Sequence, residues 1–512
     1  MGAIAVIAGI VIGVLLVGPW AGAVMGGGIA LLLIGLRLAG VRSRGVAAAG
    51  SLALIAGVLV VAIGAARSLN PDPVESRHLT TPVVTNDSVT TTAGRAYPAG
   101  LVRRFFAGSL NRRLWEIPVR LPLLNLETAG GGLSPVRITG GEQTVGLRLL
   151  GFDSMGYDFR PIVKYPVPIL PRWMWRSAVA AALDDQMAAQ FPFGAVVVAR
   201  LLDAAGIAAP TPVPVVMPDD PRLGPYRARF AGRVGLFAVH ADERPVNQPG
   251  FAGYTRIVDS DTMYADLRRN PESSFDDQYY LRIRLIDMLV GDWDRHSGQW
   301  RWARDGNRWR AIPEDRDWAF ARMNGVVGAL APLAYTQYVG FSPQLPPVKR
   351  LALQADHIDH RVLNRLDRQD FLAAARVVRF ALTDSVIAAA VAALPPPYLA
   401  LERERLVVAL KARRDHLEEY STEYYRYLAR RLHLYGFATS ADVVEFDQVS
   451  DSGGRVRLRS GGPNGPLRFE RFVDARDTRE LVLHIDKDQD RVLGNRDLPF
   501  KVSIEAGPRP GE

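Results

Sequence analysis

The sequence predicts an α+β protein in which apolar N-terminal helices precede a strand-rich region, a helix-rich region and a small antiparallel β domain. Three observations lead to this prediction. Residues 1–36 carry no charged side chain, residues 241–435 contain long stretches with helical periodicity, and residues 436–512 return to short alternating segments between glycine-rich turns. Apolar residues make up 48% of the chain and charged residues 22%, so the part that follows the N-terminal stretch can bury an ordinary core.

The first 66 residues are expected to form two or three transmembrane helices. The uncharged run 45–66 has about the ~20 residues that are needed to cross the hydrocarbon of a bilayer. Residues 1–36 are too long for one span and are interrupted at 18–20 (Gly-Pro-Trp), which favours two short helices; one long, kinked helix is the alternative. A signal peptide fits less well, because there is no basic start and two further apolar stretches follow.

The basic loop Arg37–Arg44 sets the expected topology. The positive-inside rule places this loop in the cytoplasm, so the last helix runs outward. We therefore expect an inner-membrane, multi-pass protein whose residues 67–512 lie on the extracytoplasmic side. Residues 67–100 are polar and rich in proline and threonine, and they are predicted to be a linker without helix or strand.

Charge and cysteine content narrow the classes of function. The formal net charge of +9 suits anionic partners such as nucleotides or lipids, but no run of Lys and Arg is long enough to indicate nucleic-acid binding. The chain has no cysteine, which excludes disulfides, thiolate metal sites and cysteine nucleophiles.

The strand-rich region 101–240 is predicted to contain one main sheet with two helices. A pair of glycines, Gly140 and Gly141, stands just before the first of two strands that a turn at 153–156 would join. The strands of this region are expected at 146–150, 157–164, 212–217 and 233–239, and the helices at 176–190 and 194–205.

The helix-rich region 241–435 is predicted to hold a hairpin between its helices. An amphipathic helix over 275–290 ends at Gly291, and Asp305-Gly306 between alternating apolar residues is a strong hairpin signal over 299–313. Long helices are expected over 369–393 and 398–432.

The stretch from Gly291 to Phe320 concentrates the polar groups that could do chemistry. A loop after the helix presents Asp294, and an amide oxygen, Gln299, follows five residues later. The hairpin then carries the chain out and back, so Asp315 and Asp317 are expected beside the first loop. Phosphoryl transfer needs such a set, because one carboxylate accepts the proton of the attacking hydroxyl and hard oxygen ligands hold Mg²⁺.

These requirements give each residue an expected role. Asp294 is the candidate catalytic base. Gln299 and Asp315 are the candidate metal ligands, and Asp317 is either a further ligand or a support for one. The alternative is a buried polar network over 291–320 that only ties two strands to a helix.

The order of these motifs resembles the catalytic core of atypical kinases. A helix, an Asp-Arg-His loop, a polar residue at plus five, a hairpin and D-x-D-x-A-F are similar to secretory-pathway protein kinases, CotH-type spore-coat kinases, HipA-type kinases and type II phosphatidylinositol kinases. The chain also resembles, over most of 100–500, a bacterial envelope module with a "GDWDRHxxQWRW" signature. The resemblance implies a two-lobed protein-kinase-like fold, with an N-lobe over 101–240 and a C-lobe over 241–435.

The same resemblance implies an ATP site upstream of the loop. Lys164 would be the phosphate-binding lysine, and Asp185 on the next helix would hold it. The chain departs from these kinases at Gln299, where asparagine is usual, and in its glycine loop, which is not G-x-G-x-x-G. The residues expected to cover the phosphates are Gly140, Gly141, Gln143 and Thr144.

The leading function is therefore phosphoryl transfer from ATP, with Mg²⁺ or Mn²⁺, to a protein, lipid or glycan acceptor. The alternative from another class is an inactive pseudokinase that serves as a binding or assembly module at the envelope. Two further metal sites are possible on spacing alone. His357 and His360 lack a third ligand, and the Asp486, Asp488 and Asp490 loop has Arg491 where calcium loops need glycine, so a solvated turn is expected there.

Overall fold

The computed structural model describes residues 83–85, 87–140, 145–242, 248–437, 441–486, 489–494 and 497–506. The predicted transmembrane helices, residues 1–66, lie outside this part of the chain. Within the described part, no single helix has the length and apolar character to cross a membrane, and one bent pair, Val179–Ala189 with Gly194–Ala204, meets both criteria across a 47° bend.

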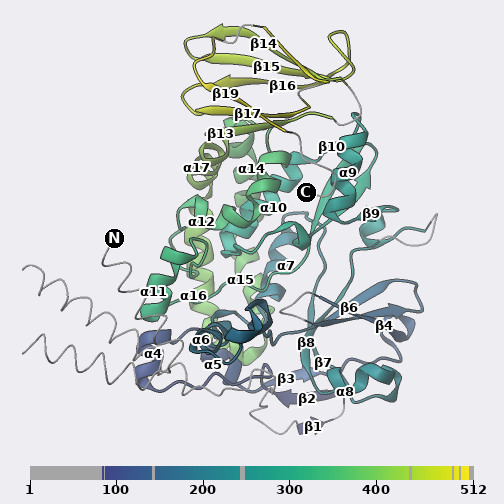
Figure 1. Ribbon diagram of the computed structural model, residues 1–512. Helices are drawn as coiled ribbons and strands as arrows, with labels where there is room; N and C mark the ends of the chain where they lie inside the picture. Colours follow the sequence, from purple (N-terminus) through teal and green to yellow (C-terminus); the bar gives the residue numbers. More distant parts are fainter. Residues whose placement is uncertain are drawn as a thin grey trace, which may run out of the picture.

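The N-terminal part is built around a five-stranded antiparallel sheet in the order β4-β5-β6-β8-β7 (Figure 1). Its apolar face buries Leu147, Leu149 and Phe159, because alternate residues of a strand point to the same side. The strands agree with the predicted ones, except that β6 ends three residues before Lys164. Their bounds are β4 Leu133–Thr139, β5 Gly146–Gly151, β6 Gly156–Pro161, β7 Val213–Val216 and β8 Val234–Val239.

A second small sheet departs from the predicted linker. Strands β1 (Val83–Thr85) and β2 (Ser88–Thr91) lie inside residues 67–100 and pair with β3 (Val119–Pro122). Val89 is buried in the core, which explains why this stretch is strand rather than irregular chain. The helices of the N-terminal part are α4 Leu101–Ala107, α5 Arg112–Glu116, α6 Ala178–Gln186, α7 Gly194–Ala204 and α8 Arg227–Phe230.

The helical lobe surrounds α10 (Asp277–Val290), which is buried along most of its length (Figure 1). The predicted helix over 369–393 is wrong in its continuity, because the Thr383 side chain caps a new helix at the Val386 amide. The predicted helix over 398–432 is likewise two helices, divided at His416. The lobe contains α9 Ser260–Arg269, α11 Gly325–Ala334, α12 Val348–Ala352, α13 Asp356–Val362, α14 Arg368–Ala381, α15 Asp384–Ala392, α16 Pro396–Asp415 and α17 Leu417–Ala429.

The predicted hairpin is confirmed as β11 (Trp300–Asp305) and β12 (Arg308–Pro313), with Gly306 at φ +58° in the turn. Short strands β9 (Ile257–Val258) and β10 (Ser274–Phe275) extend it to four strands. The hairpin packs on α10 through Tyr280, whose ring lies 4.9 Å from that of Trp300. The chain that leaves the hairpin then returns to the C-terminal end of α10, where the Phe320 amide donates to the Val290 carbonyl at 3.0 Å.

The C-terminal β domain is only partly antiparallel, so that prediction is wrong for one of its sheets. Strands β14, β15 and β16 follow one another as antiparallel neighbours in one sheet, which β18 joins at a parallel edge, while β13, β17 and β19 form a second sheet that is parallel throughout (Figure 1). The domain has its own apolar core between the sheets. Its strands are β13 Arg431–Tyr435, β14 Val443–Ser450, β15 Gly453–Arg459, β16 Leu467–Asp474, β17 Glu480–Ile485, β18 Arg491–Gly494 and β19 Lys501–Ala506.

Candidate functional site

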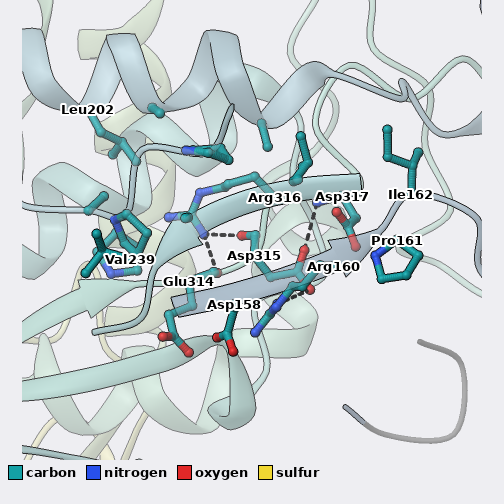
Figure 2. Close-up of a pocket in the computed structure, with 18 of the residues that line it drawn as sticks. Asp158, Arg160, Pro161, Ile162, Leu202, Val239, Glu314, Asp315, Arg316 and Asp317 are labelled. Carbon is teal, nitrogen blue, oxygen red and sulfur yellow. Dashed lines mark hydrogen bonds and ion pairs between the residues drawn. The ribbon is translucent and has the colours of Figure 1, made fainter. Parts of the chain in front are cut away.

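A cavity lies between the main sheet and the helical lobe (Figure 2). Its enclosed part has a volume of about 90 Å³, and beyond this it opens to solvent. One wall is formed by β6 and β8, a second by α7, and a third by the chain that leaves the hairpin, residues 313–317. We call it the interlobe cavity.

Arg295 joins the two loops that the sequence singles out. Helix α10 stops at Gly291, whose φ of +74° turns the chain out of the helix. Arg295 then points back into the protein, where it is fully buried. It donates to the backbone carbonyl oxygens of Glu314 at 2.8 Å and of Asp315 at 2.9 Å. The loop that carries Asp294 therefore lies against the turn that carries Asp315, as predicted.

The two carboxylates of the turn face cations from the N-terminal sheet. Asp315 has a φ of +53°, and its carboxylate accepts the Asp317 amide at 3.1 Å and the Arg160 guanidinium at 3.1 Å. The Lys164 ammonium group pairs with the Asp317 carboxylate. Lys164 is thus brought to the predicted metal-binding aspartates across the cavity.

The charges at this point are coupled. Burial lowers the pKa of Lys164, but the carboxylates of Asp317, Asp315 and Asp294 raise it well above its ordinary value. Burial raises the pKa of Asp317 to about 6, with the charge of Asp315 acting in the same direction. Burial would also raise the pKa of Asp315, but Lys164 and Arg160 hold it well below its ordinary value.

Asp294 is close enough to Lys164 and Asp315 for their charges to shift its pKa. Its pKa is raised, primarily by burial, while His296 and Lys164 lower it and Asp315 raises it. Asp315, Asp317 and Arg160 therefore line one end of the interlobe cavity, and Lys164 and Asp294 lie close to these carboxylates.

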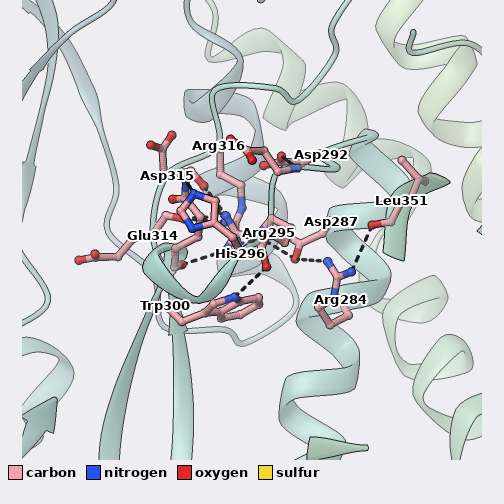
Figure 3. A network of polar contacts seen from close by, with 12 residues as sticks. Arg284, Asp287, Asp292, Arg295, His296, Trp300, Glu314, Asp315, Arg316 and Leu351 are labelled. Atoms are coloured by element: carbon pink, nitrogen blue, oxygen red, sulfur yellow. Dashed lines mark hydrogen bonds and ion pairs between the residues drawn. The ribbon is translucent and has the colours of Figure 1, made fainter. Parts of the chain in front are cut away.

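A buried ion network lies behind this site (Figure 3). The Asp287 carboxylate receives three guanidinium groups, from Arg284 at 3.1 Å, Arg295 at 3.3 Å and Arg316 at 3.1 Å. Arg284 also pairs with Asp359 at 2.9 Å. The alternative of a buried polar network over 291–320 is thus real, and it exists beside the cavity-facing carboxylates rather than in their place.

Three rings pack between the two loops. Trp293 lies 4.7 Å from Trp318 and 5.3 Å from Tyr338, measured between ring centroids. Tyr338 follows α11, so this cluster connects that helix to both loops. Trp293 and Trp318 therefore hold the two loops together through ring packing.

Two predicted contacts are not formed. Asp185 was expected to hold Lys164, but it is buried in ion pairs with Arg112 at 2.6 Å and with Arg103, so that prediction is wrong. The side chain of Gln299 contacts the His296 ring at 3.2 Å and not an aspartate of the turn. The backbone carbonyl of Gln299 accepts from Arg295 instead.

The predicted glycine loop is described only at its start. Gly140 follows β4 with a φ of +101°, a conformation that favours glycine. Gly141, Gln143 and Thr144 lie outside the described residues.

The other spacing-based metal sites are occupied by protein contacts. His360 pairs with Asp356 at 3.5 Å and packs on His433, and Asp490 accepts the backbone amides of Asp442 and Asp486. Over the described ranges, no group of three His, Cys, Asp or Glu side chains is arranged to hold a metal ion. Asp488 lies outside those ranges.

Sequence reasoning missed the charged face of β6. Asp158 and Arg160 both point to the cavity (Figure 2), because Tyr157 and Phe159, which alternate with them along the strand, face the core of the sheet. The carboxylates of Asp158 and Glu314 also line the cavity. Buried His240 lies 2.9 Å from Asp158 and 3.3 Å from Glu314. Two charged residues that alternate with aromatic ones in a central strand are the signal that could have indicated this.

Comparison with known proteins gives weak structural matches. No family model and no curated protein matches the chain. A Helicobacter pylori proinflammatory kinase, CtkA, matches over 57% of this chain and 94% of its own, at 12% identity and a TM-score of 0.30. HipA from a Shewanella oneidensis MR-1 toxin–antitoxin complex with HipB and operator DNA matches over 57% of this chain and 67% of its own, at 13% identity and a TM-score of 0.30.

Proposed function

We propose that the chain is a membrane-anchored, kinase-like phosphotransferase that uses ATP with Mg²⁺ or Mn²⁺ and transfers a phosphoryl group to a protein, lipid or glycan acceptor. One observation carries the proposal. The carboxylates of Asp315 and Asp317, which line one end of the interlobe cavity, pair with Arg160 and Lys164, and Asp294 lies close enough to raise the pKa of Lys164.

The donor set fits a metal–nucleotide complex. Mg²⁺ is usually held by one or two carboxylates together with phosphate oxygens, so Asp315 and Asp317 are enough on the protein side. A bound divalent ion would supply neutralisation of the phosphate charge. Arg160 and Lys164, which approach from the opposite wall, would bind phosphate oxygens once these displace the carboxylates from them.

Asp294 is the residue that suits proton acceptance. Its carboxylate is partly buried, and burial raises its pKa toward the working range of a general base. It stands in the loop next to the phosphate-binding end, and among the described residues no arginine forms an ion pair with it, unlike Asp287. The acceptor hydroxyl would therefore approach from the side of the Asp294 loop.

Nucleotide binding by the full-length chain tests this function. ATP with Mg²⁺ or Mn²⁺ is expected to raise the midpoint of thermal unfolding, and Lys164→Met and Arg160→Met should each reduce that rise. Lys501→Met is the matched control, since its ammonium pairs with Glu480 in the β domain at 2.8 Å. Absence of any rise with either metal would overturn the proposal.

A second function, that of a pseudokinase acting as an envelope binding or assembly module, has its own support. Gln299 is bound to His296, and Asp185 is bound to two arginines, so neither takes the role that the resemblance implies. This function predicts nucleotide binding without transfer. Release or transfer of the γ-phosphoryl group from ATP, lost in Asp294→Asn, would exclude it.

A further inference from the structure

Large apolar side chains gather on one exposed surface of the protein. Leu101 on α4 is 87% exposed, Leu333 on α11 is 84% exposed, and Trp173 in the turns before α6 is 75% exposed. Surfaces of this kind usually mark an interaction site in a soluble body. The other exposed apolar residues of these segments are Phe105, Ile169, Trp175, Leu330 and Tyr335.

The three segments adjoin one another (Figure 1). Asn324, which precedes α11, accepts the Leu110 amide at 3.0 Å and donates to the Ser109 hydroxyl at 2.8 Å, just after α4. Helix α6 is joined to α4 by the Arg103–Asp185 ion pair and by a bond from Gln186 to the Ala107 carbonyl at 3.2 Å. These contacts place the three segments beside one another, and we call their exposed side chains together the α4–α11 surface.

The charges on this surface have one sign. Residues 101–107, 166–180 and 325–335 contain no Asp or Glu. Their charged residues are four arginines, and the guanidinium of one of them, Arg172, lies 6.0 Å from the ring centre of Trp175. The four are Arg103, Arg104, Arg172 and Arg176.

This combination identifies the chemistry of the partner. Tryptophan and tyrosine favour the headgroup level of a bilayer, leucine and phenylalanine enter its acyl boundary, and arginine is attracted to anionic lipid. Aromatic residues and arginine are also enriched in protein interfaces, so cover by protein is the outcome that the test below must exclude. The uncharged run 45–66, which is expected to cross the membrane, ends 35 residues before α4 begins at Leu101. A membrane that holds this run is therefore within reach of the surface.

We propose that the α4–α11 surface lies in the headgroup region of an anionic bilayer and orients the whole protein on it. The apolar side chains of α4, α11 and the turns before α6 enter the lipid, while Arg104, Arg172 and Arg176 contact its phosphate groups. This contact is separate from the interlobe cavity and does not depend on phosphoryl transfer.

The absence of cysteine makes a direct test available in the full-length chain. Single variants Leu333→Cys and Trp173→Cys carry a nitroxide label, and the protein is reconstituted into vesicles of phosphatidylcholine with phosphatidylglycerol. Phe380→Cys is the matched control, because Phe380 is 81% exposed on α14. Collision with oxygen, which concentrates in lipid, is compared with collision with a water-soluble nickel chelate.

The labels at 333 and 173 are expected to show several-fold more oxygen contact and several-fold less nickel contact than the label at 380. Equal values at the three positions would overturn the proposal. Shielding of 333 from both reagents would also overturn it, since protein, either the N-terminal segment or a second copy, would then cover the surface. The triple variant Arg104→Gln, Arg172→Gln, Arg176→Gln should reduce the difference in anionic vesicles; no reduction would refute the role of the charges.

Discussion

Arg295 donates a hydrogen bond to the backbone carbonyl oxygen of Asp315 over 2.9 Å. Because Arg295 is fully buried and also bonded to Asp287, this contact fixes the spacing between the Asp294 loop and the aspartate turn. Arg295 therefore holds the Asp294 loop and the Asp315 turn together, whereas Arg160, on β6, and Lys164, three residues after β6, reach the carboxylates from the N-terminal part.

Asp294→Asn is expected to lower the rate of phosphoryl transfer by about 10²–10⁴-fold, the usual contribution of a general base. The amide keeps the shape of the side chain but cannot accept the proton. The rate of γ-phosphoryl transfer from ATP is the measurement, together with thermal unfolding, whose midpoint should not change. Asp451→Asn, in an exposed turn of the β domain, makes the same chemical change as a control. If Asp294→Asn unfolds the protein, its role is structural.

Asp287→Ala should reduce the free energy of unfolding by about 3–5 kcal/mol, because it leaves buried guanidinium groups without their shared carboxylate. Equilibrium unfolding in urea measures the change. Asp305→Ala is the control, since Asp305 is half exposed and lies 3.4 Å from Arg310. A loss as small as that of the control would show that the network contributes little to stability.

Asp292 gives a pH dependence whose sign can be derived. Burial raises the pKa of its carboxyl to about 7, and Oδ2 has no hydrogen-bond partner among the described residues. The folded protein therefore binds more protons than the unfolded chain between about pH 4 and pH 7, so this group lowers stability as pH rises through that range. Asp292→Asn should be more stable than the wild type at pH 8.

The two proteins should differ less at pH 5, where the carboxyl of the folded wild type is already protonated. Urea unfolding of both at pH 5 and pH 8 checks this, and the Asn side chain can still accept the Asp294 amide as Asp292 does. A stability difference that does not change between the two pH values would contradict a raised pKa at this position.

His433 gives the opposite dependence. Burial, together with the neighbouring His360 and His484, lowers its pKa to about 3, and its Nδ1 lies 2.8 Å from Nε2 of His484. Arg431 lowers this pKa further, and Glu480 opposes it. The folded state therefore excludes a proton that the unfolded chain takes up, so stability is present above about pH 6.5 and is lost as pH falls toward 3.

His433→Phe should flatten the stability profile between pH 7 and pH 4. Thermal unfolding at closely spaced pH values, compared with wild type, measures the slope. The exposed His416 offers the control variant His416→Phe, which should leave the slope as it is. The same slope in both variants and in the wild type would show that His433 is not the group concerned.

Local signals predicted much of the site. The Asp305-Gly306 turn fixes the hairpin, and the hairpin in turn brings Asp315 back to the end of α10, so the neighbourhood of Asp294 follows from chain geometry. The left-handed Gly291 marks the end of α10 in the sequence as in the structure. These features depend on residues that are close in the chain.

The predictions that proved wrong have different physical causes. Asp185 pairs with Arg112, which is 73 positions away, and not with Lys164. The periodicity of the sequence does not show which arginine the fold places beside Asp185. The helical periodicity of the sequence continues across Thr383, so it predicted one helix, although the Thr383 side chain caps the start of a new one. In the β domain, β14, β15 and β16 form the expected antiparallel neighbours, but β13, β17 and β19 pair in parallel with partners distant in the chain, which local turn signals do not show.

The strand order of the β domain affects how this domain folds while the chain is being synthesised. Strand β18 supplies an edge of one sheet and β19 an edge of the other, and both come from residues 491–506, near the end of the sequence. A chain halted on the ribosome before residue 491 would leave β14 and β17 with unpaired backbone groups, and such edges recruit strands from other molecules. Pairing of residues 491–506 with β14 and β17 is thus the step that covers these edges in the nascent domain.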